Sequence, residues 1–344
     1  MGKLKELTFL RAFAILAVIT IHLTSGYLNY PSSSTTFFVF GVINRGFQFA
    51  VPLFLFLSAV LLGYKHKDDE KINLPKFYLR RLSKVILALI LWSAIYVWYF
   101  ESPITMEKIK DYLLLGKACY HLYFIPIIVQ LYLFFPIFWL LNKKTKLFKN
   151  FIICLTTFTL LQLIFTGVIR INLFRSYPYF YLLLLTYILP IGVGLFIGFN
   201  YEDAIKKLNI KSFLALLILT LIYGGLYTNS EMYNYSTYIS TLFIPIYWSL
   251  ASITLFNFSL FIKKDIILKE ISDKSFVIYL SHPLVLDHVK IWLADNPTRL
   301  SNNALINFFL LFIVKFVIVL GISYLIGLVI RIPKMIKNRI NAKN

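Results

Sequence analysis

The chain has 344 residues, of which 59% are hydrophobic and 15% charged, with a net charge of +20 and two cysteines. This composition excludes an ordinary soluble domain and predicts an integral membrane protein. The positive charge does not indicate nucleic-acid binding, because the cations lie in short clusters between apolar runs and are better explained by topology and anionic headgroups. Cys119 and Cys154 are too few for a disulfide framework and lack metal-site spacing.

Windows of about 20 apolar residues predict ten transmembrane helices with no soluble domain between them. The expected spans lie at about 7–28 and 38–63, in a third run ending near 100, and at about 120–141, 151–169, 179–199, 212–228, 237–262, 275–293 and 304–330. The mixed-charge segment 101–117 is expected to form an interfacial helix or loop. We therefore expect one all-α transmembrane domain over residues 1–344.

The distribution of cations predicts the orientation. Placing the amino terminus in the cytoplasm puts 26 of the 35 Lys and Arg residues on that side, as the positive-inside rule requires. The most basic connector, between the second and third spans, contains Arg80 and Arg81. An even number of spans then places both termini in the cytoplasm.

The first span carries an arginine and a histidine in register. Arg11 and His22 are eleven residues apart, which places them within roughly 20° of one helical face and about 16 Å apart along the axis. Ionisable residues inside a membrane usually face a protein interior or an aqueous cavity, so the pair predicts the wall of a polar cavity. The alternative is a snorkelling arginine and a neutral histidine bonded to another helix.

Several motifs resemble those of the membrane-bound acyltransferase-3 family, in the same order along the chain. The first is Arg11 and His22-Leu23, with ten residues between the arginine and the histidine. The others are residues 51–58 (VPLFLFLS, followed by Ala59 where glycine is usual), 77–81 (FYLRR), 121–124 (HLYF, with tyrosine where tryptophan is common) and 278–283 (IYLSHP). Within the family, the late segment and residues 194–202 look most like members that decorate or export poly-N-acetylglucosamine.

The resemblance implies a bundle of about ten helices in a bacterial cytoplasmic membrane and an O-acyltransferase activity. The donor would be cytoplasmic acyl-CoA, as acetyl-CoA or succinyl-CoA, used as a co-substrate without a permanently bound cofactor or metal. The acceptor would be a polysaccharide or glycolipid, with polysaccharide synthase machinery as a further partner. A histidine can deprotonate a sugar hydroxyl near neutral pH, so His22 is the expected base. Arg11, Arg80 and Arg81 lie at the cytoplasmic margin, where guanidinium groups could bind the CoA phosphates.

Four other residues are candidates for binding substrate or the developing oxyanion. Ser58 and Tyr123 could donate hydrogen bonds there, although interhelical hydrogen bonding is the commoner role for such residues. His121 could meet an acceptor or be a plain interfacial histidine. His282 precedes Pro283 and could instead bond carbonyls near a proline kink. His66, in a charged loop, is expected to be solvated.

Asp287 and Lys315 lie about 18 Å and 22 Å from the cytoplasmic ends of their predicted spans. We expect a structural ion pair between them. The main alternative to an enzyme is a polysaccharide export or assembly component without acyl-transfer chemistry, because ten aromatic-rich spans also suit a sugar path. An ion-coupled transporter is disfavoured by the scarcity of acidic residues inside the spans.

Overall fold

The computed structural model describes residues 4–169, 179–233, 237–263, 266–296 and 298–341. Within these residues the chain is helical and forms no β-strand, which confirms the all-α expectation. Its contacts divide it into two compact units. Unit 1 comprises Met1–Ala50 and Ile262–Asn344, and unit 2 comprises Val51–Phe261. The single functional domain over 1–344 stays a prediction.

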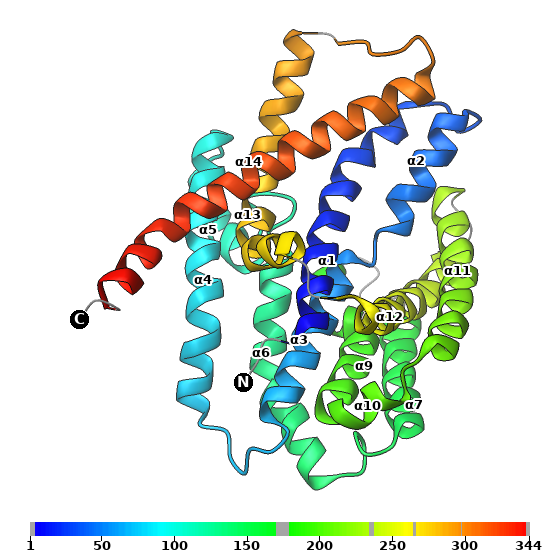
Figure 1. Cartoon of the computed structure of the whole chain (residues 1–344), viewed down its shortest axis with the longest axis vertical. Coiled ribbons are helices and arrows are strands. Elements are labelled where there is room, and N and C mark those ends of the chain that lie inside the picture. The colour runs from blue at the N-terminus through cyan, green and yellow to red at the C-terminus, as the bar shows by residue number, and fades with distance from the viewer. Residues whose placement is uncertain (1–3, 170–178, 234–236, 264–265, 297, 342–344) are drawn as a thin grey trace. The chain divides into compact units, whose positions relative to one another are not determined.

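Unit 1 brings the two ends of the chain together. Its described elements are α1 (Lys5–Thr24), the 3₁₀ helix η1 (Ser25–Asn29), α2 (Thr35–Gly46), α13 (Ile266–Asp295) and α14 (Ala304–Asn341). Helix α1 packs against α2, α13 and α14, and α13 packs against α14 (Figure 1). Small residues at fully buried positions of α1, Ala12 and Ala14, allow the neighbouring helices to approach closely.

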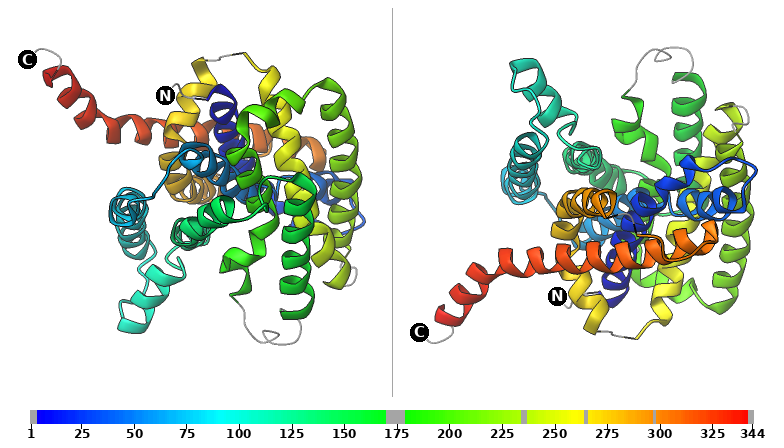
Figure 2. Two further views of the ribbon diagram at one scale, coloured as in Figure 1. Left: turned by 90° about the horizontal axis from the view of Figure 1, so that it is seen from below. Right: turned by 90° about the horizontal axis from the view of Figure 1, so that it is seen from above.

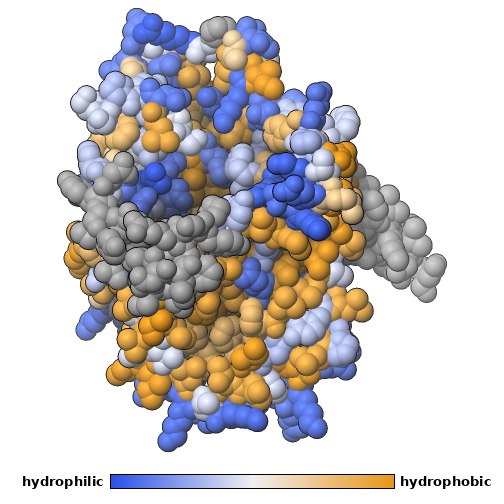
Figure 3. Space-filling view, turned by 180° about the vertical axis from the view of Figure 1, so that it is seen from behind, coloured by the Kyte–Doolittle hydropathy of each residue, from blue (hydrophilic) through white to orange (hydrophobic). Residues whose placement is uncertain are grey.

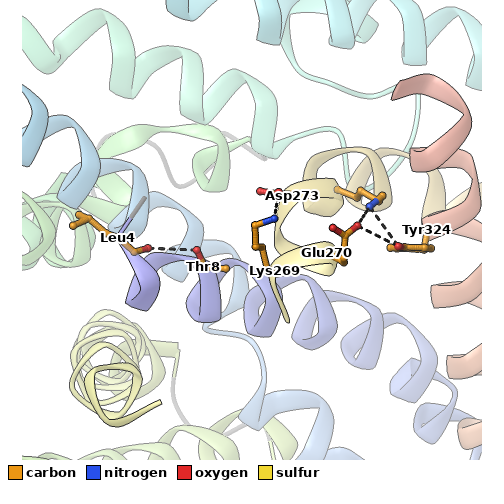
Figure 4. Close-up of polar contacts among 7 residues, drawn as sticks. Leu4, Thr8, Lys269, Glu270, Asp273 and Tyr324 are labelled. Carbon is orange, nitrogen blue, oxygen red and sulfur yellow. Dashed lines mark hydrogen bonds and ion pairs between the residues drawn. The ribbon is translucent and has the colours of Figure 1, made fainter. Parts of the chain in front are cut away.

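Polar side chains join helices of unit 1 at two places described here. The side-chain amide of Asn44 in α2 donates to the Ile21 carbonyl at 2.6 Å and to Thr24 Oγ1 at 3.0 Å, near the carboxyl end of α1. In α13, Lys274 binds Glu270, and Tyr324 of α14 donates to the same carboxylate at 3.3 Å (Figure 4). The hydrogen bond from Lys274 holds the pKa of Glu270 below its ordinary value.

Unit 2 contains the middle of the chain. Its described elements are α3 (Ala50–His66, from Val51 on), α4 (Leu74–Tyr99), α5 (Met106–Leu114), α6 (Phe124–Lys144), α7 (Phe151–Leu163), the π-helix η2 (Ile164–Ile169), the 3₁₀ helices η3 (Phe180–Leu182) and η4 (Leu184–Tyr187), α9 (Ile188–Phe199), α10 (Tyr201–Lys207), α11 (Ile210–Met232) and α12 (Thr237–Phe261). Helix α9 packs against α7 and α12, and α12 packs against α11 (Figure 2). Helix α4 packs against α6.

The surface is suited to lipid. Seven stretches of the described residues are long and apolar enough to cross a membrane, or eight if the bent pair α9 and α10 counts as one span. Only 6% of the apolar window of α11, and of α14, is buried within the protein, so their aliphatic side chains need a hydrocarbon environment. Hydrophobic side chains spread over much of the face in Figure 3, while hydrophilic ones gather at its upper and lower ends. Figure 1 places the α3–α4 and α6–α7 connections at the lower end. The chain is an integral membrane protein; ten spans and cytoplasmic termini stay predictions.

Two predicted spans are interrupted in the structure. The second, expected at 38–63, is divided into α2 and α3 by residues 47–49. Pro52 lies in the first turn of α3, where its missing N–H has no helical partner, and it disfavours helical continuation into the preceding turn. The sixth, expected at 179–199, begins with the short 3₁₀ turns η3 and η4 and becomes α-helical only at Ile188.

Two glutamine side chains form hydrogen bonds with backbone groups of the irregular segment and of the first turn of α9. Gln130 of α6 donates to the Leu182 carbonyl at 2.8 Å and accepts from the Leu184 N–H at 3.0 Å. Gln162 of α7 accepts from the Leu189 N–H at 3.3 Å. An unsatisfied backbone group in hydrocarbon costs several kcal/mol, so these side chains make the non-helical segment tolerable.

Candidate active site

The structure pairs His22 with a second histidine in unit 1. His22 lies in the last turn of α1, and His282 lies in the middle of α13, directly before Pro283. The packing of α1 on α13 brings the two imidazole rings to 5.3 Å between centroids, with an interplanar angle of 29°. His22 is half-buried and His282 is fully buried. The His22 ring, in the first span, therefore contacts another helix of the protein.

The hydrogen bonds of His282 determine which of its ring nitrogens carries the proton. Nδ1 lies 2.8 Å from the Tyr279 carbonyl and 3.2 Å from the Ile278 carbonyl. A carbonyl oxygen only accepts, so Nδ1 donates. In a neutral ring Nε2 then carries the lone pair, which can accept a proton or a hydrogen bond. This geometry includes the carbonyl bonding expected for a histidine beside a proline, and it adds a contact with His22.

Arg11 lies on the same helix as His22, as the sequence indicates. Both side chains are half-buried, whereas 12 of the 20 residues of α1 are buried. Their shared stripe is thus a more accessible part of a mostly buried helix. The polar cavity along this stripe stays a prediction.

Arg80 and Arg81 line a basic cavity in unit 2. The cavity has a volume of about 230 Å³ and lies where the end of α3 meets the start of α4. Its lining residues include five cations and one carboxylate: Lys65, Lys71, Lys76, Arg80, Arg81 and Asp69. Arg81 also lies over the ring of Tyr132 on α6, at 5.7 Å from the centroid. Such an excess of guanidinium and ammonium groups suits a ligand with several phosphates.

His66 is not the solvated loop residue that the sequence predicts. It ends α3, its side chain is only 14% exposed, and its Nδ1 binds Asp69 Oδ2 at 2.6 Å. The ring packs against Phe77 of α4 and Phe135 of α6, at 5.5 Å and 5.4 Å between centroids. The helix extends further than the hydropathy suggests, which carries His66 into the aromatic contact and into the lining of the basic cavity.

The other candidate residues of unit 2 lie at separate places. Ser58 is half-buried on α3. His121 lies in the turn before α6, is 2% exposed and packs edge-on against Tyr96 of α4 at 5.4 Å, so it is a core residue within this unit. Tyr123 directly precedes α6 and meets the ring of Tyr181 edge-on at 5.5 Å. Of the three, Tyr123 is thus the one that adjoins the irregular segment before α9.

Asp287 and Lys315 lie on α13 and α14, two helices that pack against each other. Both side chains are half-buried. The ion pairs that the structure shows in α13 lie nearer its amino end, between Lys269 and Asp273 at 3.8 Å and between Lys274 and Glu270. The Asp287–Lys315 pair stays a prediction.

Sequence reasoning missed part of the basic cavity and an aromatic cavity in unit 2. Lys76, Arg80 and Lys84 recur every four residues, which already indicates one helical face, but the participation of Lys65 and Asp69 depends on the turn between two helices. The aromatic cavity is lined by Tyr181, Tyr187 and Trp248 among others. No motif marks these residues, because they come from different helices.

Comparison with known proteins identifies the protein family. The acyltransferase domain family matches residues 4–328, which covers parts of both units, and the chain belongs to this family. It is an integral membrane member of that family.

Curated relatives are named for polysaccharide export. A Staphylococcus epidermidis protein named "probable poly-beta-1,6-N-acetyl-D-glucosamine export protein" is 27% identical over 297 residues, covering 82% of this chain and 81% of the relative. A protein of the same name from Staphylococcus aureus strain MRSA252 is 26% identical over 307 residues, covering 82% of each chain. No solved structure matches significantly.

Proposed function

We propose that the protein is an O-acyltransferase that moves an acetyl or succinyl group from cytoplasmic acyl-CoA to a hydroxyl of an extracytoplasmic polysaccharide, in a bacterial cytoplasmic membrane. The observation that carries the proposal is the basic cavity at Arg80 and Arg81. CoA carries a pyrophosphate and a further phosphate, and this cavity offers five cations against one carboxylate. Export of a neutral or cationic glycan gives no reason for such a site.

His22 is the proposed general base. Its imidazole takes the proton of the acceptor hydroxyl while that oxygen attacks the thioester carbonyl. The tetrahedral intermediate collapses by breaking the carbon–sulfur bond, and the CoA thiolate takes the proton from the imidazolium. Ser58 and Tyr123 are the proposed hydrogen-bond donors to the oxyanion, and Arg11 a further phosphate contact.

The first experiment measures binding of acetyl-CoA and succinyl-CoA to the purified protein in detergent at increasing salt concentrations. Binding should weaken with salt and should fall by about tenfold or more when Arg80 and Arg81 are both replaced by Gln, because charge-assisted hydrogen bonds are lost. The matched control is Lys143→Gln with Lys144→Gln, which removes two exposed charges at the end of α6. Equal losses in both double variants, or no CoA binding at all, would contradict the proposal.

The second experiment tests the chemistry. His22→Ala should abolish transfer of a labelled acyl group to surface polysaccharide while the protein remains in the membrane and still binds acyl-CoA. Full acylation by this variant would refute the role of His22. The alternative function, polysaccharide export without chemistry, is favoured by the names of the relatives. It predicts that glycan secretion depends on the protein and that the secreted glycan carries no acyl group traceable to it.

A further inference from the structure

A second cavity of unit 2 has the size and lining of a site for one sugar ring. Its volume is about 140 Å³, close to the ~150 Å³ cavity that accommodates a single benzene ring in an engineered protein. Six of its lining residues are aromatic or carry a hydroxyl: Thr166, Phe180, Tyr181, Thr186, Tyr187 and Trp248. None of the described residues that line it is charged, which favours a neutral ligand.

The aromatic faces in this cavity are held in place. Tyr187 stacks on Trp248 of α12 at 5.3 Å between centroids and 15° between planes. The Tyr187 hydroxyl donates to the Tyr181 carbonyl at 3.1 Å. Tyr181 remains 44% exposed, and its ring is supported edge-on by Tyr123. An exposed aromatic ring on a fixed backbone is a platform for the apolar C–H face of a pyranose.

The polar atoms complement the hydroxyl rim of a sugar. Thr186 donates its hydroxyl proton to the Phe180 carbonyl at 2.9 Å, and Thr166 donates to the Gln162 carbonyl at 2.7 Å, so both oxygens keep lone pairs that can accept. The Trp248 indole N–H is buried and has no hydrogen-bond partner among the described residues. A buried donor without an acceptor is costly, and a ligand oxygen would satisfy it.

The segment that carries Tyr181 is anchored from outside as well as from α6. Lys117 donates to Tyr179 Oη at 2.5 Å and to Asp111 at 2.8 Å, and the Asp111 hydrogen bond raises the pKa of Lys117 above its ordinary value. Gln130 holds the backbone at Leu182 and Leu184. The cavity is therefore preformed, which reduces the entropic cost of binding.

We propose that this cavity is the acceptor subsite and that it binds one neutral pyranose unit, a hexose or N-acetylhexosamine, against Tyr181 with a hydroxyl or acetamido oxygen on the Trp248 N–H. The proposal rests on the proposed function, which requires a glycan acceptor. An acyl chain of a lipid is disfavoured because the hydroxyl oxygens and the indole N–H would gain no partner from it.

The test uses the purified full-length protein and a β-1,6-linked trisaccharide of N-acetylglucosamine, with affinity measured by calorimetry. Trp248→Phe keeps the aromatic stacking and removes the N–H, and should weaken sugar binding about fivefold, as expected for one hydrogen bond. Tyr181→Ala removes the platform and should weaken it about tenfold or more. The control is Trp98→Phe, the same change at an 80% exposed position of α4, which should leave the affinity unchanged.

The melting temperature of the same samples reports correct folding, and CoA binding separates this proposal from the proposed function. Sugar binding that needs Trp248 and Tyr181 in a protein that neither binds CoA nor acylates would support the subsite and overturn the acyltransferase proposal. Acylation by a protein whose sugar affinity is the same in Trp248→Phe, Tyr181→Ala and wild type would overturn the subsite alone. The subsite proposal would likewise be overturned if only detergent or lipid displaced the trisaccharide and neither Trp248→Phe nor Tyr181→Ala changed its affinity.

Discussion

At the scale of single residues, the contact between His22 and His282 has a chemical consequence. When a base takes a proton in a low-dielectric site, a neighbouring neutral imidazole can stabilise the charge, whereas a second protonated ring would repel it. His282 is suited to the neutral role because its Nδ1–H is already committed to the Tyr279 carbonyl. We therefore assign His282 as a positioning residue for His22 within the proposed mechanism.

Replacing His282 by Phe keeps a ring of similar shape but removes both nitrogens. We expect the acyl-transfer rate of the purified protein to fall about tenfold or more, because the imidazolium of His22 loses a polar neighbour. The KM for acyl-CoA should change little, and the pH–rate profile should shift. The control is His288→Phe on the same helix, since His288 makes the same kind of bond, from Nδ1 to the Leu284 carbonyl at 2.9 Å, but is exposed. Similar losses in both variants, with unshifted pH profiles, would assign His282 a purely structural role.

The residue scale also separates what sequence can predict from what it cannot. His22 and Arg11 stand out because an ionisable side chain in an apolar run is costly and needs a reason. The ring that meets His22 cannot be inferred from hydropathy, since His282 lies at the other end of the chain and the contact depends on how α1 packs on α13. The prediction that His66 is solvated is wrong for a similar reason, because its aromatic neighbours come from two other helices.

At the scale of elements, α9 packs unusually closely against α3 in unit 2. A Cβ added at Gly194 would lie 2.6 Å from the Phe56 carbonyl oxygen, and one at Gly198 would lie 2.4 Å from the Val60 carbonyl oxygen. Glycines four residues apart present one smooth face that lets two membrane helices come together. The spacing is visible in the sequence, but the partner helix is not.

Gly198→Ala should destabilise the protein, because the new methyl group would clash with backbone that cannot move aside. Overpacking of this kind costs about 1–3 kcal/mol, so the melting temperature in detergent should fall by roughly 3 °C or more. Gly225→Ala on α11 is the matched control, since nothing lies within 4 Å of its added Cβ. That control should melt at the same temperature or slightly higher, owing to the better helix propensity of alanine. An unchanged melting temperature for Gly198→Ala would mean that α9 and α3 are not packed this tightly.

The irregular segment before α9 explains why the sixth span could not be placed from hydropathy alone. Its residues are apolar enough for a helix, yet two 3₁₀ turns replace the first part of the span. What makes this possible is the pair of glutamines on α6 and α7 that bond its backbone. A polar residue in an apolar helix is a signal for such compensation, but the segment that it serves becomes known only from the fold.

At the scale of the whole molecule, the sequence predicts an all-helical membrane protein because hydrocarbon leaves the backbone few other solutions. The number of spans is harder to predict. Helix α13 is 30 residues long but is interrupted by charged residues at Asp287 and Lys290, and α7 is only 13 residues long before it becomes a π-helix. The assembly of unit 1 from both chain ends depends on tertiary packing, which no local pattern encodes.

Orientation is the whole-molecule property on which the donor side of the proposed reaction depends, and it can be measured with single cysteines in a Cys119→Ala, Cys154→Ala background. Both native cysteines are buried. Glu70→Cys, between α3 and α4, and Lys144→Cys, at the end of α6, should react with a membrane-impermeant maleimide only after permeabilisation. Glu107→Cys on α5 and Asn302→Cys before α14 should react in intact cells. All four positions are exposed.

The physical reason is that clustered Lys and Arg residues beside a membrane span stay on the cytoplasmic side. Glu70 adjoins residues that line the basic cavity, so its side of the membrane is also that of the cavity. Labelling of Glu70→Cys in intact cells would place that cavity on the side where acyl-CoA is absent. The cations at Arg80 and Arg81 would then have to bind an extracytoplasmic anion, and CoA could not be the donor. Cytoplasmic Glu70 with extracytoplasmic Glu107 would instead give the cavity access to acyl-CoA and leave α4 as the span that separates the two sides.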